Sequence, residues 1–135
     1  MKNVFSYIIP FYYQQIYKVV SLPIYDGMAP DTEKGSYIIL GDRNFTQTEG
    51  KNDYLGKCQI LLQVVIKSPN FGYKDVDDVI SQILSIFNSD NTLTMTDGYQ
   101  IINTYVISQQ YLPSINRTDM VFQGLLRLEH KICQI

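Results

Sequence analysis

The chain has 135 residues, about the size of one domain, and its 45% apolar content is sufficient for a buried core. With 13 acidic residues against 11 basic ones, its net charge is −2, which excludes bulk electrostatic attraction to nucleic acid. The 2 cysteines cannot make a disulfide framework, and no apolar run approaches the ~18 residues of a membrane-spanning helix. We therefore expect one domain over residues 1–135, with no membrane segment.

Residues 4–20 are predicted to form a helix, because apolar side chains recur there at steps of three and four. Pro10 lies inside this pattern, so it either kinks the helix or belongs to the first turn of a helix that begins near residue 9. The opposite face is apolar as well and carries Tyr7, Phe11 and Tyr13. A helix that is apolar all round is usually covered on several sides, and we expect another subunit to supply part of that cover.

Three strands are predicted next, at residues 22–25, 37–45 and 57–67. In the third strand, apolar residues at every second position indicate one face that belongs to the core. Turn-forming residues at 47–56 indicate the tip of a hairpin that extends from Gly41 to Lys57. Polar segments of this length in a small domain are often functional, although a solvated loop has the same composition. The charged residues of the hairpin have both signs and are Asp42, Arg43, Glu49, Lys51, Asp53 and Lys57.

A second helix is predicted over residues 75–87, where apolar residues follow the helical period and three aspartates stand at the start. Asp75, Asp77 and Asp78 are expected to cap the helix and complement its dipole, which accounts for them better than a cation site does. Three more strands are predicted at residues 92–96, 99–111 and 120–132, with a tight turn at Asp97-Gly98. Hairpin-like links between strands predict an α+β fold: a mostly antiparallel sheet, two helices packed on one face, and a projecting β-hairpin.

The residues that carry most enzymatic and metal chemistry are sparse. His130 is the only histidine, and the parity of its strand places it on the core face, as it does Cys58. These two could be neighbours in the sheet, but no motif of a nucleophile and its base surrounds them. Cys133 lies three positions from His130, which on a strand is the opposite face, so a shared zinc ion is not expected. No glycine-rich phosphate loop occurs, and we predict no catalytic, cofactor-binding or metal-binding residue.

The order of elements between Leu22 and Leu40 is similar to that of a known family. A short apolar segment ends in Tyr25-Asp26-Gly27, a link with Pro30 and Gly35 follows, and the apolar strand Tyr37-Ile38-Ile39-Leu40 stops at Gly41-Asp42. This order resembles the tail-completion and tail-terminator proteins of tailed bacteriophages, which form rings at the head–tail junction. Ser36 stands where these proteins usually have a proline.

The resemblance implies a structural virion protein with no enzymatic activity. It implies a homo-oligomeric ring, of six or twelve copies in this family, that contacts portal or connector proteins and tail proteins. DNA would pass through the lumen without specific contact. The protein would be located in the virion, and in the host cytoplasm during assembly. The resemblance also implies that the hairpin contacts a neighbouring subunit or lines the channel.

Two alternatives remain open from the residues alone. One is a small α+β module that binds a host protein. The other is a small enzyme that uses Cys58 and His130.

Overall fold

The computed structural model describes residues 3–47, 55–67, 72–87, 93–95, 99–112 and 121–134. The helices are α1 (Phe5–Val19) and α2 (Lys74–Phe87). The strands are β1 (Ile24–Asp26), β2 (Tyr37–Gln47), β3 (Leu55–Lys67), β4 (Leu93–Thr94), β5 (Tyr99–Leu112) and β6 (Val121–Gln134). Each predicted element is present, but the strand predicted at residues 92–96 is only two residues long.

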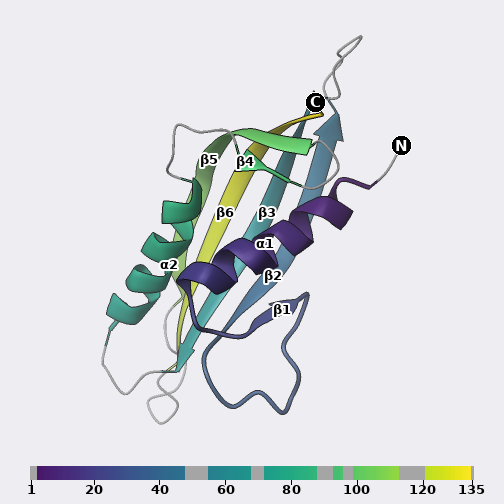
Figure 1. Cartoon of the computed structure of the whole chain (residues 1–135). Helices are drawn as coiled ribbons and strands as arrows, with labels where there is room; N and C mark the ends of the chain where they lie inside the picture. Colours follow the sequence, from purple (N-terminus) through teal and green to yellow (C-terminus); the bar gives the residue numbers. More distant parts are fainter. Residues whose placement is uncertain are drawn as a thin grey trace.

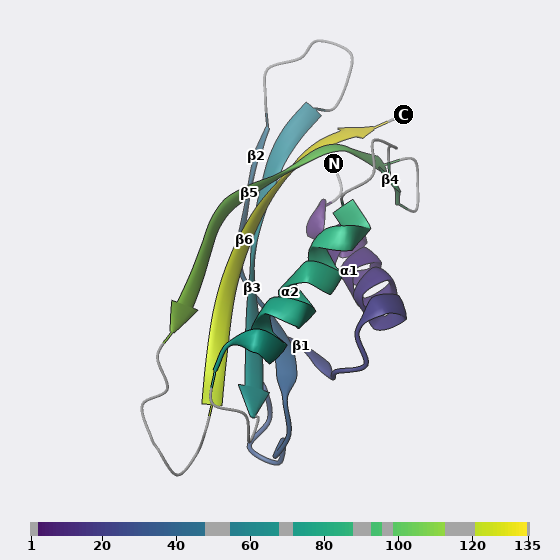
Figure 2. The ribbon, with the colours of Figure 1, turned by 90° about the vertical axis from the view of Figure 1, so that its left-hand side faces the viewer.

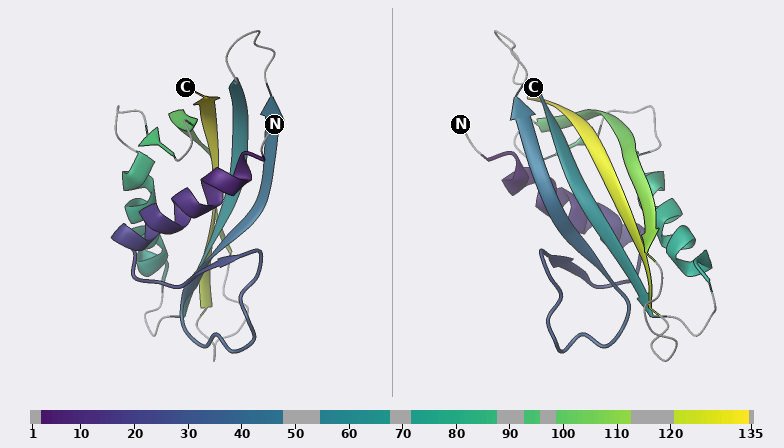
Figure 3. Two further views of the ribbon diagram at one scale, coloured as in Figure 1. Left: turned by 45° about the vertical axis from the view of Figure 1, so that its right-hand side comes forward. Right: turned by 180° about the vertical axis from the view of Figure 1, so that it is seen from behind.

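The strands form a single sheet in the order β1-β2-β3-β6-β5-β4, and both helices lie on one face of it (Figures 1 and 2). β3 and β6 are central and pair antiparallel from Leu55↔Cys133 to Lys67↔Val121. β5 pairs antiparallel with the other edge of β6. Within the described residues, the other face of the sheet carries no helix, as the view from behind shows (Figure 3). The α+β class and the two helices on one face are therefore as predicted.

The sheet is mixed, which corrects the expectation of hairpin-like links throughout. β1 runs parallel to β2, with Ile24 opposite Ile38 and Asp26 opposite Leu40. The link over residues 27–36 makes this possible, because it is long enough to return the chain to the start of β1 before β2 begins. Gly27 opens the link with a φ of 87°, and its N–H donates to the Leu40 carbonyl at 2.9 Å. The tip of the predicted projecting hairpin, residues 48–54, lies outside the described residues.

The core fills the space between the helices and the sheet. On β3, the predicted alternation is confirmed, because Cys58, Ile60, Leu62 and Val64 have no exposed surface. Each fully buried aliphatic side chain contributes roughly 1.5–3 kcal/mol relative to exposure. β6 and α2 supply the facing side chains, which are Leu126, Leu128, Ile132, Val76, Val79, Ile80 and Ile83.

α2 approaches β6 closely at a glycine. A Cβ atom on Gly124 would lie 2.6 Å from Cγ1 of Val76 and 2.9 Å from Cδ1 of Ile80. Real Cβ atoms do not come this near to other carbons, so glycine at this position sets the distance between helix and sheet.

Pro10 lies inside α1, and the helix continues on both sides of it. The helix begins at Phe5, so Pro10 is not in its first turn, which excludes one of the two roles predicted for it. The missing proline N–H removes one helical hydrogen bond, to the Ser6 carbonyl. Both Pro10 and Ser6 are exposed, so this loss falls on the solvent side of the helix and spares the core.

Candidate interaction surfaces

The predicted hairpin residues divide into three groups. Arg43 forms an ion pair with Asp26 of β1, and its guanidinium carbon lies 5.8 Å from the centre of the Phe5 ring. It therefore connects β2 to β1 and α1 within the chain, and its contact with a neighbouring subunit stays a prediction. Asp42, beside the irregularity in β2, and Lys57 on β3 are exposed. Three further predicted residues lie outside the described part of the chain: Glu49, Lys51 and Asp53.

The aromatic face of α1 is covered largely by the chain itself. Tyr7 is 7% exposed and packs on Tyr99 of β5, with ring centres 4.6 Å apart. Phe11 is 6% exposed. These two residues therefore expose little surface in the folded chain, and their contact with another subunit stays a prediction. Tyr13 is partly buried against the core, so it retains some accessible surface.

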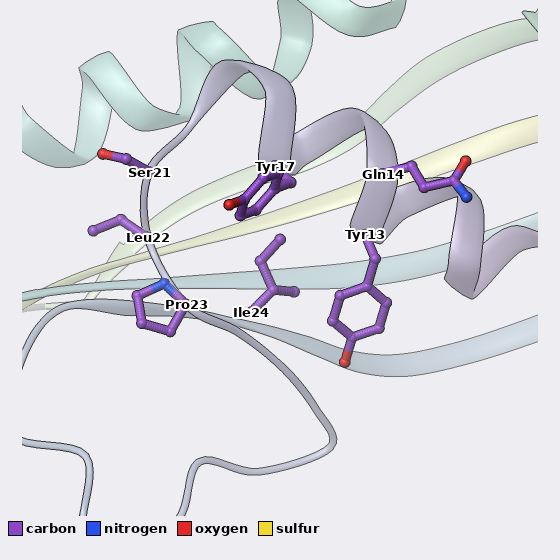
Figure 4. A pocket seen from close by; sticks show the side chains of 7 residues that line it. All are labelled: Tyr13, Gln14, Tyr17, Ser21, Leu22, Pro23 and Ile24. Atoms are coloured by element: carbon purple, nitrogen blue, oxygen red, sulfur yellow. The ribbon is translucent and has the colours of Figure 1, made fainter.

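The C-terminal half of α1 instead borders an open apolar pocket of about 640 Å³. Figure 4 shows the rings of Tyr13 and Tyr17 beside Ile24 and Pro23, which belong to the segment that follows the helix. Tyr17 is 78% exposed, although aromatic side chains usually gain much from burial. In the part of the chain that the structure describes, no charged residue lines the pocket, whose remaining lining residues are Gln14, Ser21 and Leu22.

β5 forms a second apolar surface near the opposite edge of the sheet. β4 pairs only with Gln100 and Ile101, so within the described residues no strand pairs with the outer edge of β5 beyond them. Exposed apolar patches of this kind mark interaction sites. Irregularities beside Ile101 and Val106 interrupt the ladder, which favours contact through side chains over simple strand addition. The exposed large apolar residues are Ile102, Tyr105, Val106, Ile107, Tyr111 and Leu112.

The sequence offers a signal for this surface that our interpretation did not use. No residue from Tyr99 to Leu112 is charged, although 18% of the whole chain is. In a central strand that composition reflects burial. At an edge strand it indicates a surface that contacts another molecule.

His130 is a satisfied core residue. Cys58 lies directly opposite it in the β3–β6 register, as the parity of the strands allowed. The Tyr12 hydroxyl hydrogen-bonds to its Nε2 atom, and Thr104 Oγ1 lies 2.8 Å from its Nδ1 atom. The Phe87 ring packs against the imidazole with centres 4.8 Å apart. A neutral imidazole has one donor and one acceptor, and both find partners here.

The electrostatics of this cluster oppose nucleophilic chemistry. Burial lowers the pKa of His130 to about 3 and raises the pKa of the Cys58 thiol to about 12. Burial also raises the pKa of Tyr12 well above 10.0. All three groups are therefore neutral near pH ~7, and a Cys–His pair needs the opposite shifts to form a thiolate. The hydrogen bond between Tyr12 and His130 instead holds α1 against the sheet.

The aspartates at the start of α2 make ordinary contacts of a helix N-terminus. Lys74 and Asp78 form an i,i+4 ion pair at 3.2 Å, and Asp77 accepts a hydrogen bond from the Tyr111 hydroxyl. Within the described ranges, no three histidine, cysteine or acidic residues are grouped so as to hold a metal ion. No helix in the described part of the chain is long and apolar enough to cross a membrane.

The chain was compared with known families, curated proteins and solved structures. No protein-family model matches it, and no curated protein matches it by sequence. A chain in the structure of the virion of the native gene transfer agent (GTA) particle has the same fold. The TM-score is 0.74, and the match covers 98% of this chain and 99% of that chain at 14% sequence identity. At this identity the likeness shows the fold alone.

Proposed function

We propose that this chain is a structural subunit of a tailed phage or phage-like particle. It forms a homo-oligomeric ring at the head–tail junction or at the end of the tail, as a tail terminator or connector. One observation carries the proposal: a protein of the GTA virion shares the fold over practically the full length of both chains. The order of elements in Leu22 to Leu40, which resembles tail-terminator proteins, supports the same assignment.

Two apolar surfaces support assembly into a ring. A cyclic ring needs heterologous contacts, in which one patch of each subunit meets a different patch of the next. The pocket beside β1 and the exposed side chains of β5 lie toward opposite edges of the sheet, as a repeating head-to-tail contact requires. Neither surface carries a charge, so burying one against the other costs no ion desolvation. We propose that β5 of each subunit packs against the pocket of its neighbour.

The ring contacts portal or connector proteins on one side and tail proteins on the other, and DNA passes through its lumen. Six or twelve copies suit this role. The hairpin residues Asp42, Arg43, Glu49, Lys51, Asp53 and Lys57 then lie near a neighbour or the channel. The protein is assembled in the host cytoplasm and resides in the virion. Its contribution is geometric, because no reaction is required of a ring that joins two parts of a particle.

The proposal is tested by a β5 variant that keeps the fold. Tyr105 and Ile107 are 53% and 46% exposed, so Tyr105→Asp with Ile107→Asp places two charges on the surface without disturbing the core. The expected result is a normal circular dichroism spectrum, no ring by mass photometry, and no incorporation into particles. Met28→Asp is the matched control, because Met28 is 77% exposed and outside both surfaces.

Normal ring formation and incorporation of the double variant contradicts the proposed interface. A wild-type chain that stays monomeric and is absent from particles contradicts the proposed function. That outcome favours the alternative of a small module that binds a host protein.

A further inference from the structure

The right-hand view of Figure 3 shows the helix-free face of the sheet. Side chains of β3 and β6 that alternate with buried ones point to this face. Polar and basic side chains predominate among them. They are Lys57, Gln59, Leu61, Gln63, Val65, Lys67, Gln123, Leu125, Arg127, Glu129 and Lys131.

Two lysines are opposed on this face. Lys57 of β3 and Lys131 of β6 are direct partners in the register, and both are exposed. Like charges directly opposite each other destabilise a strand pair. Arg127 lies on the same face of β6, opposite Leu61. Repulsion between the two lysines lowers the stability of the free protein, and an anionic partner bound at this face relieves that repulsion. We call these three residues the basic patch.

Among the described residues, the acidic side chains near the basic patch leave it positive. Glu129 lies between Arg127 and Lys131 along β6, and it accepts a hydrogen bond from Gln59 at 3.1 Å. Asp42 is exposed on β2. The helix α2, which carries the three aspartates, lies on the opposite face of the sheet (Figure 2). The net charge of −2 describes the whole chain, so it does not reveal that three basic side chains lie on one face.

Lys67 is on the same face but does not belong to the patch. Its charge acts on Glu33, where it is a minor cause of a lowered pKa, after the hydrogen bonds from Tyr25 and Gly35. Its ammonium also lies 5.7 Å from the centre of the Tyr37 ring.

We propose that the basic patch contacts the phosphate backbone of duplex DNA. This inference rests on the proposed function, because it assigns the helix-free face of each subunit to the lumen of the ring. Charge complementarity favours DNA as the occupant of this face. Nearby amides are engaged with other protein groups, as in the Gln63–Gln123 hydrogen bond of 2.7 Å, so the face is not arranged to read base edges.

The strength of the contact suits a conduit. Three phosphate contacts give a slope of log affinity against log salt of about −2.7 for one subunit. Such binding is weak and independent of sequence, and it allows DNA to slide. A ring repeats the contact in every subunit without fixing the DNA at one register.

The test measures binding of a short labelled DNA duplex by fluorescence anisotropy at salt concentrations between about 50 and 200 mM. The variant is Lys57→Gln with Arg127→Gln and Lys131→Gln. The matched control is Lys18→Gln with Lys34→Gln and Lys74→Gln, which removes the same charge from α1, the link over residues 27–36 and α2. Circular dichroism checks that both variants fold.

We expect wild type and control to bind with a steep salt dependence, and the patch variant to bind roughly tenfold more weakly at low salt with a flattened slope. Equal weakening in both variants, or no duplex binding by wild type at low salt, overturns the inference. Binding of polyglutamate in place of DNA also overturns it, and indicates an acidic protein partner. Mass photometry of the same samples separates the two proposals. A ring that forms but does not bind DNA contradicts only the proposed contact of the basic patch with DNA. DNA binding by a chain absent from particles contradicts the proposed function instead.

Discussion

Tyr12 and His130 join α1 to β6 at the centre of the core, through a hydrogen bond between the phenol and the imidazole, and neither side chain has exposed surface. The bond fixes the first helix on the sheet, and its removal leaves the Nε2 atom of His130 without a partner. Tyr12→Phe should therefore lower the free energy of unfolding by about 1–3 kcal/mol. Tyr17→Phe is the control, since Tyr17 is 78% exposed, and urea denaturation measures both. Equal stability of the two variants would contradict the role of this bond.

The same histidine predicts a pH dependence of stability. Burial lowers the pKa of His130 from 6.5 to about 3. Between these two pH values the unfolded chain therefore binds a proton at this residue and the folded chain does not. Stability is therefore full above pH ~6.5 and falls by about 1.4 kcal/mol for each pH unit below it. Urea denaturation of the wild type between about pH 7 and 5 should show this loss.

His130→Asn should be less stable than the wild type at neutral pH but should lack this slope. The pKa of Glu33 is lowered from 4.5, so protonation of this carboxylate affects stability only in solutions more acidic than the interval between about pH 7 and 5. An identical slope in wild type and variant would show that another group titrates.

The contact between α2 and β6 predicts a strong effect of one methyl group. Gly124→Ala places its Cβ atom 2.6 Å from Val76, so either the helix or the strand must shift. We expect a loss of about 1–3 kcal/mol in the free energy of unfolding. Gly72→Ala is the matched control, because nothing lies within 4 Å of a Cβ there, and it should change stability by less than about 0.5 kcal/mol. A neutral Gly124→Ala would show that the helix does not set this distance.

The buried face of α2 gives a third stability test. Ile83 has no exposed surface, so Ile83→Ala should cost about 2–5 kcal/mol. Gln82→Ala changes an exposed neighbour on the same helix and should stay within about 0.5 kcal/mol. Thermal and urea denaturation measure both. Reversed magnitudes would mean that the helix presents a different face to the sheet.

The tip between β2 and β3 should be dispensable for folding. Gln47 and Gly56 are already paired in the ladder, so two residues in place of residues 48–54 leave, together with Leu55, a three-residue turn that closes the hairpin without changing the strands. We expect a folded monomer with a normal circular dichroism spectrum and reduced incorporation into particles. Normal incorporation and normal titre would show that Glu49, Lys51 and Asp53 make no contact that assembly needs.

Local periodicity was enough to predict most elements. The alternation of β3 and the helical spacing of α2 each match the burial in the structure, because both elements bury one face against a single core. The Cys58–His130 adjacency was foreseen only as a possibility from parity. Its register depends on the pairing of β3 with β6, two strands far apart in the sequence.

Other features depend on tertiary geometry that local patterns do not record. The burial of Tyr7 follows from the position of Tyr99, and the intrachain partner of Arg43 follows from the parallel pairing of β1 with β2. The exposure of β5 follows from the shortness of β4, whereas the apolar pattern of β5 alone indicated an ordinary strand. The basic patch arises only when the register sets Lys57 opposite Lys131.

Electron microscopy of particles that contain this protein tests the central proposal most directly. Averaged density of the head–tail junction and of the tail end should contain a closed ring of subunits with this fold, joined through β5 and the pocket beside α1 and β1. Particles that lack the protein, or that carry it only as isolated copies, would contradict the proposed function.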